Sequence, residues 1–185
     1  ARITRTNSAL NSVSVAAEIL QLRSKELMRQ TIRRLNADQS YSVHKGLRDY
    51  ELYTKTPVKV RVLSPADAEQ FSVTITPVDD NHVMLKDWGK NPGPTPMKVM
   101  LNKEVNTPIG RVLISSTAYY NKSYSGQDIR VVKSLPDQVL GYFMGNLEIT
   151  QMEEDASILQ VAMKDRTPDR AADIGERAER GTEVF

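Results

Sequence analysis

The apolar residues near the start of the chain recur at spacings of three and four, which places them on one face of an α-helix. The residues that follow this spacing are Val13, Ala16, Ala17, Leu20, Leu27, Met28, Thr31, Ile32 and Leu35. The pattern predicts a helix from about Ser12 to Leu35, and residues 36–38 are expected to end it. Residues 1–11 are expected to form a flexible N-terminal segment.

From Ser40 onward, apolar residues alternate with polar ones, which is the pattern of half-buried β-strands. The alternation is clearest at residues 58–62 and 71–76, and the turn residues 79–81 predict a β-hairpin that continues into residues 82–86. Further strands are expected at residues 41–43, 97–101, 111–115, 127–132, 147–149 and 157–163. The prolines and glycines of residues 88–96 predict a surface loop.

Two more helices are expected in the last third of the chain. Pro136 introduces a short helix that closes near Gly145, and Thr167 with Pro168 forms the N-cap and first turn of a closing helix. Apolar residues almost disappear after Ile174, so residues 175–185 are expected to be a frayed tail or a truncated helix. The order of elements predicts one α+β domain over residues 12–174. Its mixed, mainly antiparallel sheet is expected to be covered on one face by an N-terminal and a C-terminal helix.

Composition narrows the classes of function. The 185 residues include 25 basic and 23 acidic side chains, a net charge of +2, which disfavours a dedicated nucleic-acid binder. The absence of cysteine excludes disulfides and thiolate chemistry. No stretch approaches the roughly 20 apolar residues of a membrane span, and a start at alanine is typical of a fragment whose flanking segments have been removed.

The sequence carries no recognisable catalytic or cofactor motif. Neither G-x-G-x-x-G nor the P-loop pattern occurs, and the two histidines, His44 and His82, lack a second ligand at metal-binding spacing. Carboxylates at 79–80 and 153–155 could supply the acid and base of glycosidic cleavage, but both groups fall in predicted turns, where acidic residues are common. We therefore expect no catalytic residue, no metal and no cofactor in this chain.

Two groups of residues are candidates for binding or oligomer contacts. Arg23, Arg29 and Arg33 lie on or beside the polar face of the first predicted helix, either as a solvated face or as a basic strip that meets an acidic neighbour or an anionic glycan. Tyr119 and Tyr120 cluster beside a predicted loop, where they either stack on a sugar or cover a sheet edge.

Several segments resemble one known family in a shared order along the chain. The run AEILQLRSKEL at residues 17–27, with IRRLN at residues 32–36, resembles the first periplasmic helix of polysaccharide chain-length determinants. Segments RDYELY, TPIGR, ASILQV and PDRA, beginning at residues 48, 107, 156 and 168, resemble the branch of that family found in Bacteroides-like bacteria. The resemblance covers most of residues 9–174, and the chain departs from the family at residues 175–185, where apolar residues should lead to the second membrane span.

The resemblance implies the periplasmic domain of a bacterial inner-membrane protein, a polysaccharide co-polymerase whose two membrane spans lie outside this sequence. Such domains assemble with copies of themselves into a ring and regulate the length and export of a capsular or exopolysaccharide, acting on the polymerase or the growing glycan. Related proteins often carry a cytoplasmic tyrosine kinase, but this chain is expected to be non-catalytic. The alternative is a soluble glycan-binding or glycan-processing domain, indicated by the tyrosines and the turn carboxylates.

Overall fold

The computed structural model describes residues 24–64, 70–88, 95–151 and 159–180. Their contacts divide the chain into two compact units. Residues up to Ala37 and from Pro136 onward form one unit, which we call the helical unit, and Asp38–Leu135 form the other, which we call the β unit.

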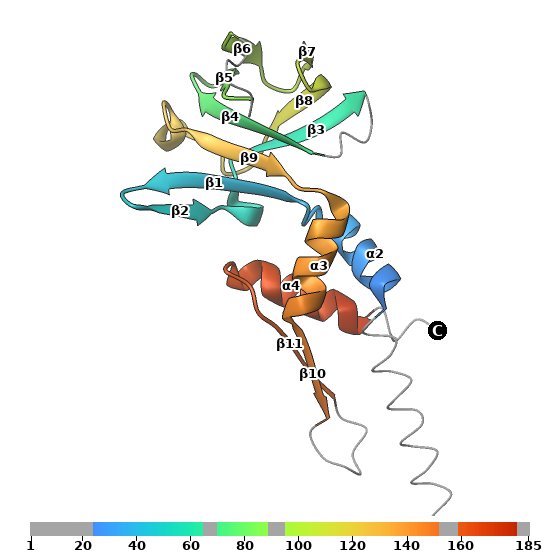
Figure 1. The fold of residues 1–185 in the computed structure, drawn as a ribbon. Helices are drawn as coiled ribbons and strands as arrows, with labels where there is room; N and C mark the ends of the chain where they lie inside the picture. The colour runs from blue at the N-terminus through green and yellow to red at the C-terminus, as the bar shows by residue number, and fades with distance from the viewer. Residues whose placement is uncertain (1–23, 65–69, 89–94, 152–158, 181–185) are drawn as a thin grey trace, which may run out of the picture. The chain divides into compact units, whose positions relative to one another are not determined.

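The β unit contains two antiparallel sheets. The larger sheet has six strands in the order β2-β1-β9-β4-β5-β6, and the smaller has three in the order β3-β8-β7 (Figure 1). The strands of the larger sheet are β1 (Gln39–Lys45), β2 (Arg48–Glu51), β4 (Phe71–Pro77), β5 (His82–Lys86), β6 (Met97–Met100) and β9 (Ile129–Lys133). Those of the smaller are β3 (Val58–Ser64), β7 (Glu104–Thr107) and β8 (Gly110–Ser116), and single 3-10 turns lie at η1 (Tyr53–Lys55) and η2 (Lys122–Tyr124).

The two sheets share one hydrophobic core. Its fully buried residues include Val58 and Ile114 from the smaller sheet and Ile75 and Ile129 from the larger. The burial of alternate residues along β3 and β5 is the pattern that their sequences predict, and the predicted β4–β5 hairpin is confirmed. The core of the β unit is therefore closed by side chains from strands on both sides.

Tyr41 connects the two sheets. Its hydroxyl accepts a hydrogen bond from the Val60 amide at 3.0 Å and donates one to the Gln39 side chain at 3.1 Å. Burial raises the pKa of Tyr41 to about 12. The amide of Val60, which lies in the core, thus has a polar partner from the opposite sheet.

The helical unit consists of three helices and one hairpin, which lie next to one another in Figure 1. The helices are α2 (Lys25–Leu35), α3 (Pro136–Asn146) and α4 (Pro168–Arg180), and the hairpin pairs β10 (Leu147–Gln151) with β11 (Leu159–Met163). The fully buried cluster of this unit is Met28, Ile32, Ala37, Val139, Leu140, Phe143 and Ile174. The helices thus bury their apolar residues against one another.

The α+β class with a mainly antiparallel sheet is confirmed, and every pairing among the described strands is antiparallel. The structure begins the first predicted helix at Lys25, because Ser24 is extended, and residues 12–23 of the predicted helix lie outside the described residues. Its predicted end is confirmed, because Asn36 adopts the left-handed conformation and Ala37 donates its amide to the Ile32 carbonyl at 2.9 Å. Helix α4 continues to Arg180, so residues 175–180 are helical and not frayed, and residues 181–185 lie outside the described residues.

Candidate functional site

Several turns and loops of the β unit lie at one end of the six-stranded sheet. Antiparallel pairing places Val43 and Ile75 on either side of Ile129, and His82 beside Met100. The β1–β2 turn, the β4–β5 turn and the segment that enters β9 therefore project from the same end, on the left in Figure 1. We call this region the loop end and define it as residues 45–50, 78–81, 100–102 and 117–128.

The two predicted tyrosines of the loop end differ in accessibility. Tyr120 is partly buried against the core, and its hydroxyl donates a hydrogen bond to the Asp79 carbonyl at 2.8 Å. Burial, followed by the charges of Asp79 and Asp80, raises the pKa of Tyr120. Tyr119 is 45% exposed. Tyr120 therefore fixes the loop to the β4–β5 turn, and Tyr119 is the one that can meet a ligand.

The Asp79 carboxylate organises the β4–β5 turn. It accepts hydrogen bonds from the Asn81 amide at 3.0 Å and from His82 Nδ1 at 2.8 Å, and it lies 3.5 Å from Lys98 Nζ. The Asn81 amide, then His82, and to a smaller extent Lys98, lower the pKa of Asp79 to about 2. A carboxyl with this pKa stays ionised at neutral pH and cannot donate a proton. Asp79 therefore cannot serve as the general acid of the predicted carboxylate pair at residues 79–80.

Exposed apolar side chains concentrate at the loop end. Among the described residues, the large hydrophobic side chains that are at least 40% exposed are Leu47, Tyr50, Val78, Met100, Tyr119 and Tyr142, and all but Tyr142 belong to the loop end. Sequence reasoning found only Tyr119 of these. A signal was available at Leu47, which follows Gly46 in the β1–β2 turn at a position where polar residues are usual. This concentration makes the loop end a candidate interaction surface.

The predicted basic strip lies on the helical unit. Arg29 is partly exposed and lies 3.9 Å from Glu26 and 3.8 Å from Asp137, which links α2 to the first turn of α3. Arg33 is exposed in the last turn of α2, where a cation complements the helix dipole. Arg23 lies outside the described residues. The arginines and the tyrosines thus belong to different units, and each group is a separate candidate.

A buried ion pair, which sequence reasoning missed, fixes the start of α4. The Asp165 side chain is fully buried and accepts hydrogen bonds from Arg170 Nη2 at 2.8 Å and the Tyr142 hydroxyl at 3.2 Å. Burial opposes ionisation of Asp165, but the bonds and charge of Arg170, with the Thr167 amide, lower its pKa. The Arg170 guanidinium also lies over the Phe143 ring, 5.7 Å from its centroid. This cluster ties α3 to α4 and is structural.

The described side chains include no group of three or more potential ligands that could hold a metal ion. No helix in the described part of the chain is long and apolar enough to cross a membrane. Neither the comparison with protein-family models nor the comparison with curated proteins finds a match for this chain.

Proposed function

We propose that the chain is a non-catalytic periplasmic domain of a bacterial inner-membrane protein that regulates the chain length and export of a capsular or exopolysaccharide. It acts by association with further copies of itself and by contact with the polysaccharide polymerase or the growing glycan. No nucleic acid and no cofactor take part. Anchoring in the membrane comes from spans outside this sequence.

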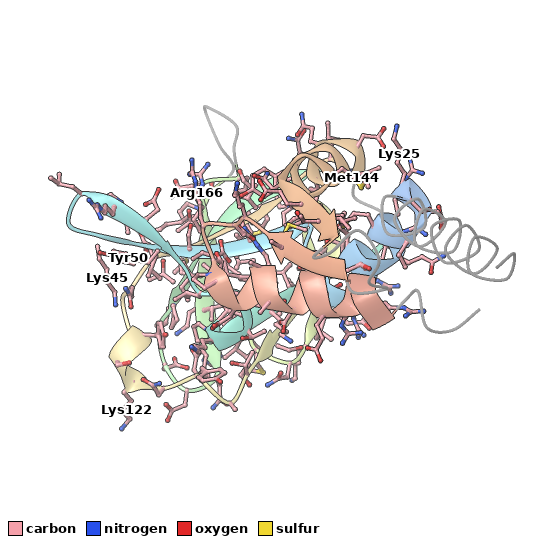
Figure 2. All side chains as sticks on the ribbon, turned by 90° about the horizontal axis from the view of Figure 1, so that it is seen from below. Lys25, Lys45, Tyr50, Lys122, Met144 and Arg166 are labelled. Atoms are coloured by element: carbon pink, nitrogen blue, oxygen red, sulfur yellow. The ribbon has the colours of Figure 1, made fainter. Side chains whose placement is uncertain are left out.

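The observation that carries the proposal is the shared location of the first and last described helices. Helices α2 and α4 pack against each other in the helical unit and both contribute to its buried cluster. Figures 1 and 2 place Lys25, where α2 begins, and the final turn of α4 on the same side of that unit. Flanking segments that leave a unit from one side can both enter the same membrane, as a domain inserted between two spans requires.

The ordered resemblance to chain-length determinants supports the same proposal. The two runs that resemble the first periplasmic helix overlap α2 at residues 25–27 and 32–35, and segments around Thr107 and Pro168 fall at a strand end and a helix start of the described fold. The exposed surfaces described above suit association better than catalysis, because Asp79 stays ionised at neutral pH and the Asp165 carboxylate is buried in an ion pair.

The experiment is made on the full coding sequence in the bacterium that encodes it. We expect an apolar span on each side of this chain, and we expect deletion of the gene to change the length distribution of the exported polysaccharide on a gel. A double variant Arg29→Glu/Arg33→Glu should reduce oligomer size of the detergent-extracted protein, whereas Lys59→Glu, an exposed change on β3, should not. An unchanged polysaccharide length after deletion would contradict the proposal.

A second candidate, a soluble glycan-binding module, is favoured by one observation. Tyr119 is 45% exposed and is held by a loop whose neighbour, Asn121, accepts a hydrogen bond from the Ser123 amide at 2.9 Å and donates one to the Tyr119 carbonyl at 2.9 Å. An ordered, exposed aromatic ring is a suitable platform for a sugar. Under this alternative the purified chain binds oligosaccharides, Tyr119→Ala abolishes binding, and the flanking sequence contains no apolar spans.

A further inference from the structure

The β1–β2 hairpin presents three exposed side chains on one face. Cross-strand pairing joins Val43 with Tyr50 and Lys45 with Arg48, and side chains two residues apart on a strand point to the same side. Lys45, Arg48 and Tyr50 therefore share a face, which we call the hairpin face. His44 and Asp49 form the pair between them, and their side chains point to the opposite side.

The hairpin face begins where the core ends. Val43 is 2% exposed, whereas Tyr50, directly opposite, is 51% exposed, and both Lys45 and Arg48 are exposed. Figure 2 shows Lys45 and Tyr50 next to each other on the β1–β2 hairpin. Leu47 stands at the tip and is 99% exposed. The face is thus an accessible surface that combines one aromatic ring, two cations and an apolar tip.

Lys45 and Arg48 repel each other, which lowers the stability of the hairpin. Side chains that are directly opposite on antiparallel strands lie roughly 5 Å apart at Cβ, and like charges at such positions are destabilising. The hairpin's own acids do not relieve the repulsion, because Asp49 is bonded to His44 Nδ1 at 2.7 Å and Glu51 accepts the Tyr41 amide at 2.9 Å. No ion pair involving Lys45 or Arg48 occurs among the described residues. A bound anion would remove this repulsion.

We propose that the hairpin face binds an anionic sugar residue of an acidic polysaccharide. The ring of Tyr50 stacks on the face of the sugar ring, and Lys45 and Arg48 contact its carboxylate from adjacent strands. The two cations favour an acidic sugar over a neutral one, and the Tyr50 ring favours a sugar over a simple anion. The choice of a polysaccharide rests on the proposed function. A lipid surface fits less well, because only Leu47 would reach between headgroups at the tip of this hairpin.

The test uses the purified chain and an oligogalacturonate of defined length, with the fully methyl-esterified oligomer as the matched uncharged ligand. We expect saturable binding of the acidic oligomer by calorimetry and at least tenfold weaker binding of the ester. Tyr50→Ser and the double variant Lys45→Ser/Arg48→Ser should each weaken binding by about tenfold or more. The matched control is Lys59→Ser, an exposed lysine on β3, which should bind as the unchanged chain does.

Several outcomes would overturn this inference. They are the absence of oligogalacturonate binding, equal binding of acid and ester, binding that survives the three substitutions, and binding to phosphatidylglycerol vesicles in place of the oligomer. Thermal melting of each variant checks the fold, which these exposed positions should leave intact. The inference and the proposed function fail separately, since one is measured by oligosaccharide binding at the hairpin and the other by polysaccharide length in cells and by membrane spans.

Discussion

Replacement of Asp165 with asparagine should strongly destabilise the helical unit. The substitution keeps the volume of the side chain but removes the charge that compensates Arg170, whose side chain is only 13% exposed. Breaking a buried, hydrogen-bonded ion pair from one side costs about 3 kcal/mol or more, because the Arg170 guanidinium loses the carboxylate that accepts hydrogen bonds from its Nε and Nη2. For a chain of this size that loss lowers Tm by roughly 6 to 12 °C.

The assay is thermal and urea unfolding at pH 7 of the parent chain, Asp165→Asn and a control, Asp137→Asn. The Asp137 side chain is 91% exposed, so its replacement should cost about 1 kcal/mol or less. If Asp165→Asn melts within a degree of the parent, the ion pair does not hold α4 in place and our reasoning is refuted.

The effect of Asp165 should depend on pH in one direction. Because its pKa is lowered in the folded chain, the unfolded chain binds the proton more readily. The stabilisation is complete above the unfolded pKa of about 3.9 and is lost as pH falls through the folded value. The difference in unfolding free energy between parent and Asp165→Asn should therefore shrink below about pH 4, and a difference that grows on acidification would contradict the assignment.

Three further outcomes are expected. Tyr41→Phe should cost about 1 to 3 kcal/mol in urea unfolding, because the Val60 amide loses its buried partner, and a loss near zero would mean that water replaces the hydroxyl. Ile174→Ala should cost about 2 to 5 kcal/mol, since Ile174 is fully buried, and a neutral result would refute the docking of α4. The carboxyl carbon of Asp79 should titrate by NMR near pH 2, and a midpoint near 4 would exclude its contacts with Asn81 and His82.

The sequence predicted most clearly the strands in which buried and solvated residues alternate, such as β3 and β5, since one-sided burial produces alternation. The strands it missed lack that contrast. Strand β2 is an exposed edge strand, and β7 has Val105 as its single apolar residue. Helix α4 was expected to fray after Ile174 because apolar residues end there, yet it continues to Arg180. Glutamate, arginine and alanine have high intrinsic helix propensity, which a search for apolar periodicity does not detect.

The sequence predicted a candidate surface residue only where the residue type itself indicates binding, as tyrosine does. The tyrosine pair was found, but the restraint on Tyr120 comes from the Asp79 carbonyl, 41 residues away, and no local pattern reports such a contact. Exposure of Leu47 was missed because leucine is ordinarily counted as core. The ion pair of Asp165 and Arg170 was missed because five residues separate the partners across the start of a helix, outside the three- and four-residue spacings of helical pairs.

The first and last residues of the β unit, Asp38 and Leu135, lie close together, and this favours folding of the β unit before the helical unit. Packing of α2 on α3 requires closure of a loop of roughly one hundred residues, which costs about 4 kcal/mol of chain entropy if the loop is unstructured. Pairing of β1 with β9 brings those ends together, and the Ser134 amide donates to the Asp38 carbonyl at 2.9 Å. Once the β unit has folded, the loop between α2 and α3 is already closed, and packing of these helices no longer carries that entropy cost. We therefore expect substitutions that weaken β9 to slow formation of the helical unit, although β9 contributes no residue to its core.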